Sequence, residues 1–207
     1  MSARQSTIPS HFYAIADSSF GDEPIGLVSA LLTGGAKIIQ IRLKDLPAGR
    51  LLESARRAVA LCHQHGATVL INDRADVALL AGADGVHLGQ QDLPLKAARG
   101  LLGADRIIGI STANLEQALS AQAEGADYIG FGPLYPGGLK QNPAGKGLDA
   151  LRKVRAAVKI PVVAIGGITE SNASDALAAG ADAVAIITDV LKSSDIPAKV
   201  RHLLALR

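Results

Sequence analysis

The sequence predicts a single (β/α)8 barrel. Eight short runs rich in Ile, Val and Ala alternate with longer segments of helical spacing, such as the one containing Leu51, Ala55 and Ala58. A glycine-alanine step followed by Lys or Asp precedes every second run. The chain of 207 residues also lies at the lower end of the length range for this fold. An open flavodoxin-like or Rossmann sheet is the alternative arrangement.

The apolar runs lack polar alternation, which is typical of parallel strands that are covered on both faces. Repeated strand-helix units then imply right-handed crossovers between neighbouring parallel strands. The predicted strands are residues 12–17, 37–43, 68–73, 84–89, 106–111, 128–133, 161–167 and 183–188.

The glycine-alanine steps read "GGAK" at 34–37, "AGAD" at 81–84, "EGAD" at 124–127 and "AGAD" at 179–182. We interpret each glycine as the C-cap of a helix that turns the chain into the next strand. No linker interrupts the pattern, so we expect one domain over residues 1–207, with residues 1–10 as a polar N-terminal extension.

Composition excludes several classes of function. A net charge of +2 and 3% aromatic residues do not provide the basic surface or stacking platforms of a nucleic-acid binder. No segment has the length and apolarity of a signal peptide core or a membrane span, so we expect a cytoplasmic protein. The lone Cys62 is interpreted as a small buried hydrophobic residue.

Polar side chains stand where the predicted strands end. In a (β/α)8 barrel the active site lies at the carboxyl ends of the strands, so polar residues there are candidates for function. Gln40, Arg42 and Lys44 alternate with apolar residues at the end of the second strand, and this spacing places all three on one face. Two cations and an amide are costly to bury unless a ligand meets them.

The third and fourth strands are followed by carboxylates. Asn72 and Asp73 end the third strand, and Asp92 follows the fourth. Two carboxylates on neighbouring strands, with an oxygen-rich ligand, suit Mg²⁺, whereas zinc would require a His or Cys cluster that the sequence lacks. An aspartate after a strand is also a common helix N-cap, and this alternative stays open.

The remaining strand ends indicate an anion site. Ser111 ends the fifth strand, where it or Asn114 could instead cap the next helix. Lys140 lies in a long segment, 133–147, that we interpret as a lid, although a solvated lysine is the simpler alternative. Glycines and helix starts follow the seventh and eighth strands, which is the recurrent phosphate site of these barrels.

Several motifs together resemble the thiamine phosphate synthase family. They are "QIRLK", "NDRADVALLAGADGVHLGQQDLP", "IGIST", "ADYIGFGPLYP", "GLDAL" and "IPVVAIGGIT", in this order along nearly the whole chain. The resemblance implies a barrel enzyme that joins hydroxymethylpyrimidine pyrophosphate to a carboxythiazole phosphate. It also implies Mg²⁺ as cofactor and thiamine phosphate and pyrophosphate as products.

The resemblance assigns roles to individual residues. It implies that the pyrimidine pyrophosphate is bound by Gln40, Arg42, Lys44, Asn72, Ser111 and Lys140. It implies catalytic charge stabilisation by Arg42, Lys44, Ser111 and Lys140, magnesium binding by Asp73 and Asp92, and thiazole phosphate binding by Gly167, Ile187 and Thr188. The mechanism implied is a dissociative displacement that needs no side-chain nucleophile. This agrees with the sequence, in which the histidines are scattered and form no catalytic group. His87 is expected to support ligand-binding residues without itself being catalytic.

One departure from the family pattern keeps two alternatives open. Many members carry a hydroxyl-rich triplet before the loop lysine, where this chain has Gly137, Gly138 and Leu139. A thiazole tautomerase-like paralogue would carry His after the "FG" of the sixth strand, whereas Pro133 stands here. A non-catalytic paralogue that binds thiamine precursors is the second alternative. Small-molecule substrates, with the possibility of a homo-oligomer, are the expected partners.

Overall fold

The predicted strands form a closed, all-parallel barrel. In the computed structural model each strand pairs with the next, and β8 pairs with β1. The structure describes residues 7–21, 24–44, 46–137 and 144–206. The strands are β1 Phe12–Asp17, β2 Ile38–Arg42, β3 Thr68–Asn72, β4 Gly85–Leu88, β5 Ile107–Thr112, β6 Tyr128–Phe131, β7 Val162–Ile165 and β8 Ala183–Ile186. The expectation of a (β/α)8 barrel is confirmed, and the open-sheet alternative is wrong.

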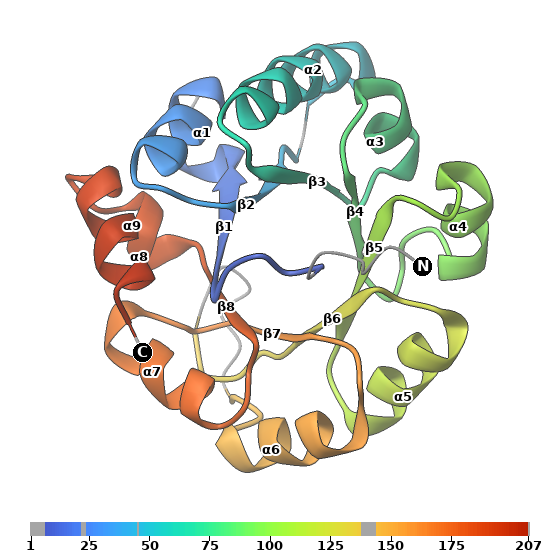
Figure 1. The fold of residues 1–207 in the computed structure, drawn as a ribbon, viewed down its shortest axis with the longest axis vertical. Helices are drawn as coiled ribbons and strands as arrows, with labels where there is room; N and C mark the ends of the chain where they lie inside the picture. Colours follow the sequence, from blue (N-terminus) through green and yellow to red (C-terminus); the bar gives the residue numbers. More distant parts are fainter. Residues whose placement is uncertain (1–6, 22–23, 45, 138–143, 207) are drawn as a thin grey trace.

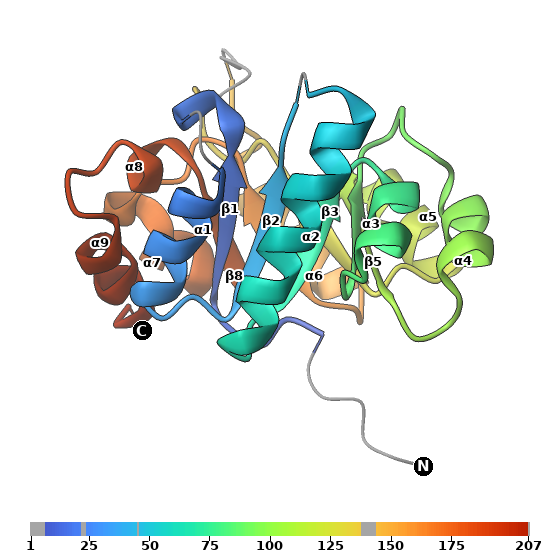
Figure 2. The same cartoon turned by 90° about the horizontal axis from the view of Figure 1, so that it is seen from above.

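Helices surround the barrel as an outer ring (Figures 1 and 2). They are η1 Ser18–Phe20, α1 Pro24–Thr33, α2 Ala48–Gln64, α3 Ala75–Ala81, α4 Leu95–Leu102, α5 Leu115–Glu124, α6 Leu148–Ala157, α7 Glu170–Ala178, α8 Thr188–Leu191 and α9 Ile196–Leu204. Within the described ranges, none of these helices combines the length and apolarity that crossing a bilayer requires.

Two apolar layers hold the ring together. The larger lies between the strands and the helices and includes Cys62, which is fully buried as expected. The smaller lies inside the barrel around Tyr13, Leu70 and Tyr128. Ile8 also belongs to this inner cluster, so the part of the N-terminal segment next to the barrel contributes to the core. Residues 1–6 lie outside the described part of the chain.

The prediction that glycines of the glycine-alanine steps cap helices is confirmed for two of them and is wrong for α7, whose C-cap is Ala179, with Gly180 following at φ of 103°. Gly82 and Gly125 are the C-caps of α3 and α5, and both adopt the left-handed conformation that favours glycine. The aspartates that follow have a role that the sequence did not reveal. Each carboxylate accepts a hydrogen bond from the backbone N–H at the start of the preceding strand: Asp84 from Val69 at 2.7 Å, Asp127 from Ile108 at 2.8 Å and Asp182 from Val162 at 2.8 Å.

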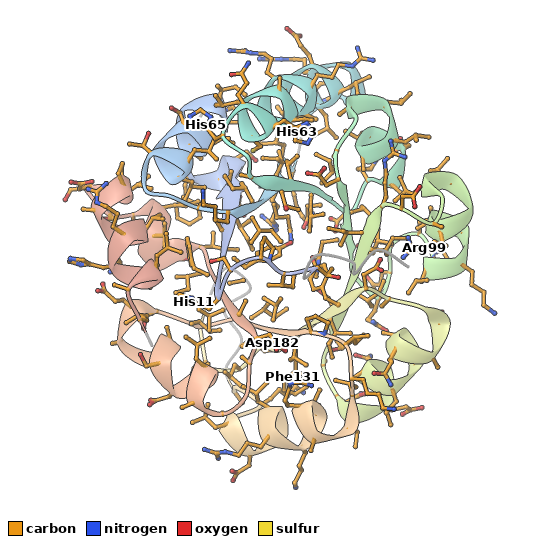
Figure 3. The ribbon with its side chains drawn as sticks, in the orientation of Figure 1. His11, His63, His65, Arg99, Phe131 and Asp182 are labelled. Carbon is orange, nitrogen blue, oxygen red and sulfur yellow. The ribbon has the colours of Figure 1, made fainter. Side chains whose placement is uncertain are left out.

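A basic side chain from the helix that precedes the first of the two strands completes each of these contacts. The pairs are His63 with Asp84, Arg99 with Asp127 and Arg155 with Asp182. Figure 3 labels His63, Arg99 and Asp182 at separate positions around the ring. The same device therefore repeats on alternate strands at the amino end of the barrel, the end at which residues serve stability in this fold.

Candidate functional site at the carboxyl end of the barrel

The end of β2 presents two of its predicted polar residues from inside the barrel. Gln40 is almost fully buried and donates a 2.8 Å hydrogen bond from Nε2 to the hydroxyl of Tyr13. The Arg42 guanidinium forms an ion pair with Asp17, a fully buried carboxylate at the end of β1. Because a guanidinium has five N–H donors, this pair fixes Arg42 at the rim and leaves further donors for a ligand.

Lys44, Asp73 and Asp92 form a charged cluster above the ends of β2, β3 and β4. The Lys44 ammonium lies 3.5 Å from a carboxylate oxygen of Asp73. Burial raises the pKa of Asp73, the neighbouring Asp92 raises it further, and Lys44 opposes the shift. Two carboxylates that disfavour each other's charge are the arrangement that a cation would relieve.

The alternative that these aspartates merely cap helices is not supported. The N-cap of α3 is Arg74 and that of α4 is Pro94, and neither helix receives a side-chain cap. Asp92 instead accepts a 2.6 Å hydrogen bond from the backbone N–H of Gly89, which fixes one of its oxygens. Arg74 forms an ion pair with Asp76.

Asp73 has a backbone conformation that is uncommon for a residue with a side chain. Its φ is 64°, and it is the only non-glycine residue with positive φ in the described part of the chain. Asp and Asn tolerate this region better than other residues do. The 2.8 Å hydrogen bond from Asp73 N–H to the carbonyl of His87 ties the turn to β4. Such local strain is found most often at functional positions. Asn72, half-buried beside it, stands in register with His87.

Ser111 faces the barrel and does not cap a helix. Its hydroxyl lies 2.8 Å from Nε2 of His87, and the cap of α5 is the side chain of Asn114. Burial lowers the pKa of His87 to about 4, so this imidazole is neutral at physiological pH. The other ring nitrogen, Nδ1, lies 2.7 Å from the hydroxyl of Tyr128.

The loops after β7 and β8 differ in part from the expectation. The N-terminus of α7 is closed to an anion, because Asn172 accepts from the N–H of Thr169 and Asp189 accepts from the N–H of Glu170. Gly167, with φ of 69°, lies against the loop after β6, where an added Cβ would stand 2.5 Å from the carbonyl oxygen of Tyr135. The first fact argues against an anion at α7, and the second shows that Gly167 is needed for its close packing against the loop after β6.

Ile187 and Thr188 mark the start of α8, directly after β8. Ile187 is partly buried and packs against both apolar clusters. Among the described residues, no hydrogen bond or ion pair joins Ile187, Thr188 or Gly167 to Lys44, Asp73 or Asp92.

The loop after β6 is anchored at its base. Leu134 and Tyr135 donate backbone hydrogen bonds to β7 and the glycine after it, and Lys146 and Gly147 donate back to Pro133 and Leu134. The segment without structure that the sequence indicated is therefore held at both ends. Lys140, Gly138 and Leu139 lie outside the described residues.

Sequence reasoning missed the partners that hold the predicted residues. Asp17 ends β1, and the same signal that identified Asp73, a polar residue at a strand end, would have found it. Tyr13 and Tyr128 carry no such signal, because a tyrosine within an apolar strand looks like any other core residue.

The residues present fit a magnesium ion. Asp73 and Asp92 supply carboxylate oxygens at an accessible rim, and Mg²⁺ is usually held by one or two carboxylates together with waters and substrate phosphates. Within the described ranges there is no group of three or more His, Cys, Asp or Glu side chains arranged around a metal position. A site closed by protein ligands alone, as in structural zinc sites, is thus not formed by those residues.

A parallel barrel with its polar groups gathered at the carboxyl end defines this chain as a (β/α)8-barrel enzyme scaffold. A family model described as thiamine monophosphate synthase matches residues 12–190, and the chain belongs to this family.

Individual relatives agree with the family assignment. A thiamine-phosphate synthase of Methanospirillum hungatei is 49% identical over 91% of this chain and 93% of its own. One of Moorella thermoacetica is 46% identical over 88% of each chain. The solved structure of a thiamine phosphate pyrophosphorylase from Pyrococcus furiosus is 38% identical, covers 95% of both chains and superposes with a TM-score of 0.88.

Proposed function

We propose that this protein is a Mg²⁺-dependent thiamine phosphate synthase. It couples 4-amino-2-methyl-5-hydroxymethylpyrimidine pyrophosphate to a thiazole phosphate, or its carboxylated form, and releases pyrophosphate. Membership of the family supports the reaction. The single structural observation that carries the proposal is the rim cluster, in which Asp73 lies beside both Asp92 and Lys44.

The chemistry needs charge stabilisation more than a nucleophile. As the C–O bond to pyrophosphate breaks, negative charge develops on the leaving group, and preorganised positive groups lower the free energy of that transition state. In this proposal Arg42, fixed by Asp17, and Lys44 bind these oxygens, and Ser111 and Lys140 are further donors. Magnesium, when bound to Asp73 and Asp92, supplies additional positive charge at the same oxygens.

The thiazole phosphate is proposed to bind on the other side of the mouth, near Gly167, Ile187 and Thr188. The attacking nitrogen must be held close to the reacting carbon, and such alignment accounts for a large part of the rate in two-substrate reactions. The glycines that replace the hydroxyl-rich triplet are compatible with this role, because the backbone N–H groups of such a segment can bind an anion. Gly137, the described member, has the left-handed backbone, with φ of 88°.

The deciding experiment is product formation by the purified protein. The two phosphorylated precursors are supplied with Mg²⁺ or with EDTA, and thiamine phosphate is measured. We expect product with Mg²⁺ and none with EDTA. Product that is unaffected by EDTA would contradict the metal site. Isomerisation of the thiazole phosphate without coupling would instead identify a tautomerase.

A further inference from the structure

A continuous hydrogen-bonded chain crosses the inside of the barrel. It runs from Gln40 on β2 to Tyr13 on β1, to Tyr128 on β6, to His87 on β4 and to Ser111 on β5. The successive distances between heavy atoms are 2.8, 2.8, 2.7 and 2.8 Å. Its two ends, Gln40 and Ser111, are both residues that the family resemblance assigns to the pyrimidine pyrophosphate. Among the inner members, Tyr13 and Tyr128 have no assigned role, and His87 was expected only to support the site.

The donor at the Gln40 end sets the direction of donation along this series of hydrogen bonds. The Gln40 amide donates to the hydroxyl of Tyr13, whose single proton is then available only for Tyr128. Tyr128 also has one proton, and in this order it donates a hydrogen bond to Nδ1 of His87. The neutral imidazole therefore carries its proton on Nε2 and donates it to Ser111.

The ionisation of the inner groups agrees with this direction. Burial raises the pKa of Tyr13 to about 12 and raises that of Tyr128 well above its usual value, so both phenols keep their protons. His87 is neutral in this order, because its Nδ1 accepts from Tyr128 and only its Nε2 carries a proton. A protonated imidazole would have two donors and an ionised phenol would have none, and either would interrupt the order of donors and acceptors.

Packing holds the rings of the chain in place. Gly109 lies against Tyr128, and an added Cβ there would stand 2.0 Å from the ring. Gly130 lies against His87, with 3.2 Å between an added Cβ and Cε1 of the imidazole. The tyrosine and the histidine thus occupy spaces that glycines on inward-facing positions leave open, and neither ring has room to turn freely.

We propose that Tyr13, Tyr128 and His87 are positioning residues that turn the hydroxyl of Ser111 into a hydrogen-bond donor toward an anionic oxygen at the barrel mouth. Since His87 donates to the Ser111 oxygen, the serine proton is free to point away from the imidazole. If donation ran in the opposite direction, the Ser111 hydroxyl would donate to Nε2 of His87. It would then present only lone pairs, which would repel a phosphate oxygen. The assignment of the anion as pyrophosphate rests on the proposed function.

The direction is tested first by the tautomer of His87, measured by ¹⁵N NMR of the histidine-labelled protein. The His87 signals are assigned by comparison with His87→Gln. We expect Nε2 protonated and Nδ1 unprotonated in the wild type. The reverse tautomer would overturn the proposal, whatever reaction the protein catalyses.

The consequence is tested by binding of inorganic pyrophosphate in the presence of Mg²⁺, by calorimetry. Because a hydrogen bond to a charged group is lost, Ser111→Ala should weaken binding on the order of 10-fold or more. Tyr128→Phe should also weaken pyrophosphate binding, and His87 should no longer be held with its proton on Nε2. Tyr13→Phe interrupts the same series of hydrogen bonds at a second position.

The double variant Tyr128→Phe with Ser111→Ala separates positioning from general damage. It should bind pyrophosphate no more weakly than Ser111→Ala alone, because both changes act on one hydrogen bond. Additive losses would overturn the proposal. Thr112→Val is the matched control, since it removes a buried hydroxyl that bonds the Gly130 carbonyl outside the chain, and should leave both readings unchanged. A wild type that binds pyrophosphate with the expected tautomer, but forms no thiamine phosphate, would contradict only the proposed function.

Discussion

At the scale of single residues, the rim aspartates combine strain with electrostatic frustration. Asp73 has a positive φ, is half-buried and lies beside a second carboxylate. None of these features stabilises the folded protein by itself. They are consistent with a position selected for a ligand, because a bound cation would offset the repulsion that the free protein carries.

The Asp73 side chain can be tested without disturbing its backbone. Asn also tolerates the left-handed region, so Asp73→Asn removes the charge and keeps the turn. We expect Mg²⁺-dependent turnover to fall on the order of 100-fold or more, because the metal's charge stabilisation is lost. The free energy of unfolding, from urea denaturation, should change by less than about 1 kcal/mol, because the partly exposed ion pair with Lys44 that is lost is offset by relief of the repulsion from Asp92.

The matched control for this variant is Asp76→Asn. Asp76 is an exposed carboxylate three residues away that pairs with Arg74, and its loss should leave turnover unchanged. Equal losses of activity in the two variants would show that Asp73 acts through local charge and not through a metal.

His87 makes a prediction about stability and pH. Its pKa is about 4 in the folded protein, below the value of roughly 6.5 for an unfolded chain, so the unfolded state binds more protons between these values. Stability therefore falls as pH is lowered through this window, and at pH 4.5 the loss from His87 is about 2 kcal/mol.

The comparison that isolates this effect is wild type against His87→Gln. Urea unfolding is measured at pH 7 and pH 4.5 for both proteins. Other titrating groups, Asp73 among them, contribute nearly equally to both, so the drop in stability should be smaller in the variant by about 2 kcal/mol. Equal drops would mean that His87 titrates in the folded protein as it does in the unfolded chain.

At the scale of elements, the strands and their order were predictable and the contacts across the barrel were not. Apolar runs and glycine returns indicate where each strand begins and ends, and these are local properties. Tyr13 and Tyr128 meet only because β1 and β6 face each other across a closed barrel, at a separation of 115 residues. In the same way, Asp189 closes the N-terminus of α7 from α8, which no local pattern indicates.

The aspartates Asp84, Asp127 and Asp182 also make contacts between distant segments that no local pattern indicates. Asp127→Ala removes the acceptor for Ile108 N–H and the partner of Arg99. We expect a loss of about 1–3 kcal/mol in the free energy of unfolding, because a backbone donor at the start of β5 is left unpaired. Turnover per folded molecule should be unchanged, since this contact lies at the opposite end of the barrel from the rim cluster.

Asp105→Ala is the control for Asp127→Ala. Asp105 is an exposed carboxylate in the turn before β5, and its replacement should cost less than about 0.5 kcal/mol. A similar cost in both variants would place the effect in the net charge of that end of the molecule and not in the hydrogen bond to β5.

At the scale of the whole molecule, the two ends of the barrel differ in how their carboxylates are paired. At the amino end Asp84, Asp127 and Asp182 each have a backbone donor and a basic partner. At the carboxyl end, Asp73 and Asp92 face each other with one lysine nearby. The first arrangement is complete in the free protein, whereas we expect a ligand to complete the second.

This division predicts how ligands change thermal stability. Mg²⁺ with inorganic pyrophosphate should raise Tm more than the sum of the two alone, because each completes the other's site and neither binds the unfolded chain. At a concentration 100 times Kd the stabilisation is about 2.7 kcal/mol, which corresponds to a rise in Tm of roughly 5–10 °C for a chain of this size. Sulfate at equal ionic strength controls for salt, and Asp73→Asn should lose the cooperative part of the rise. A rise with pyrophosphate alone that Mg²⁺ does not increase would mean that the anion is held by Arg42 and Lys44 without a metal.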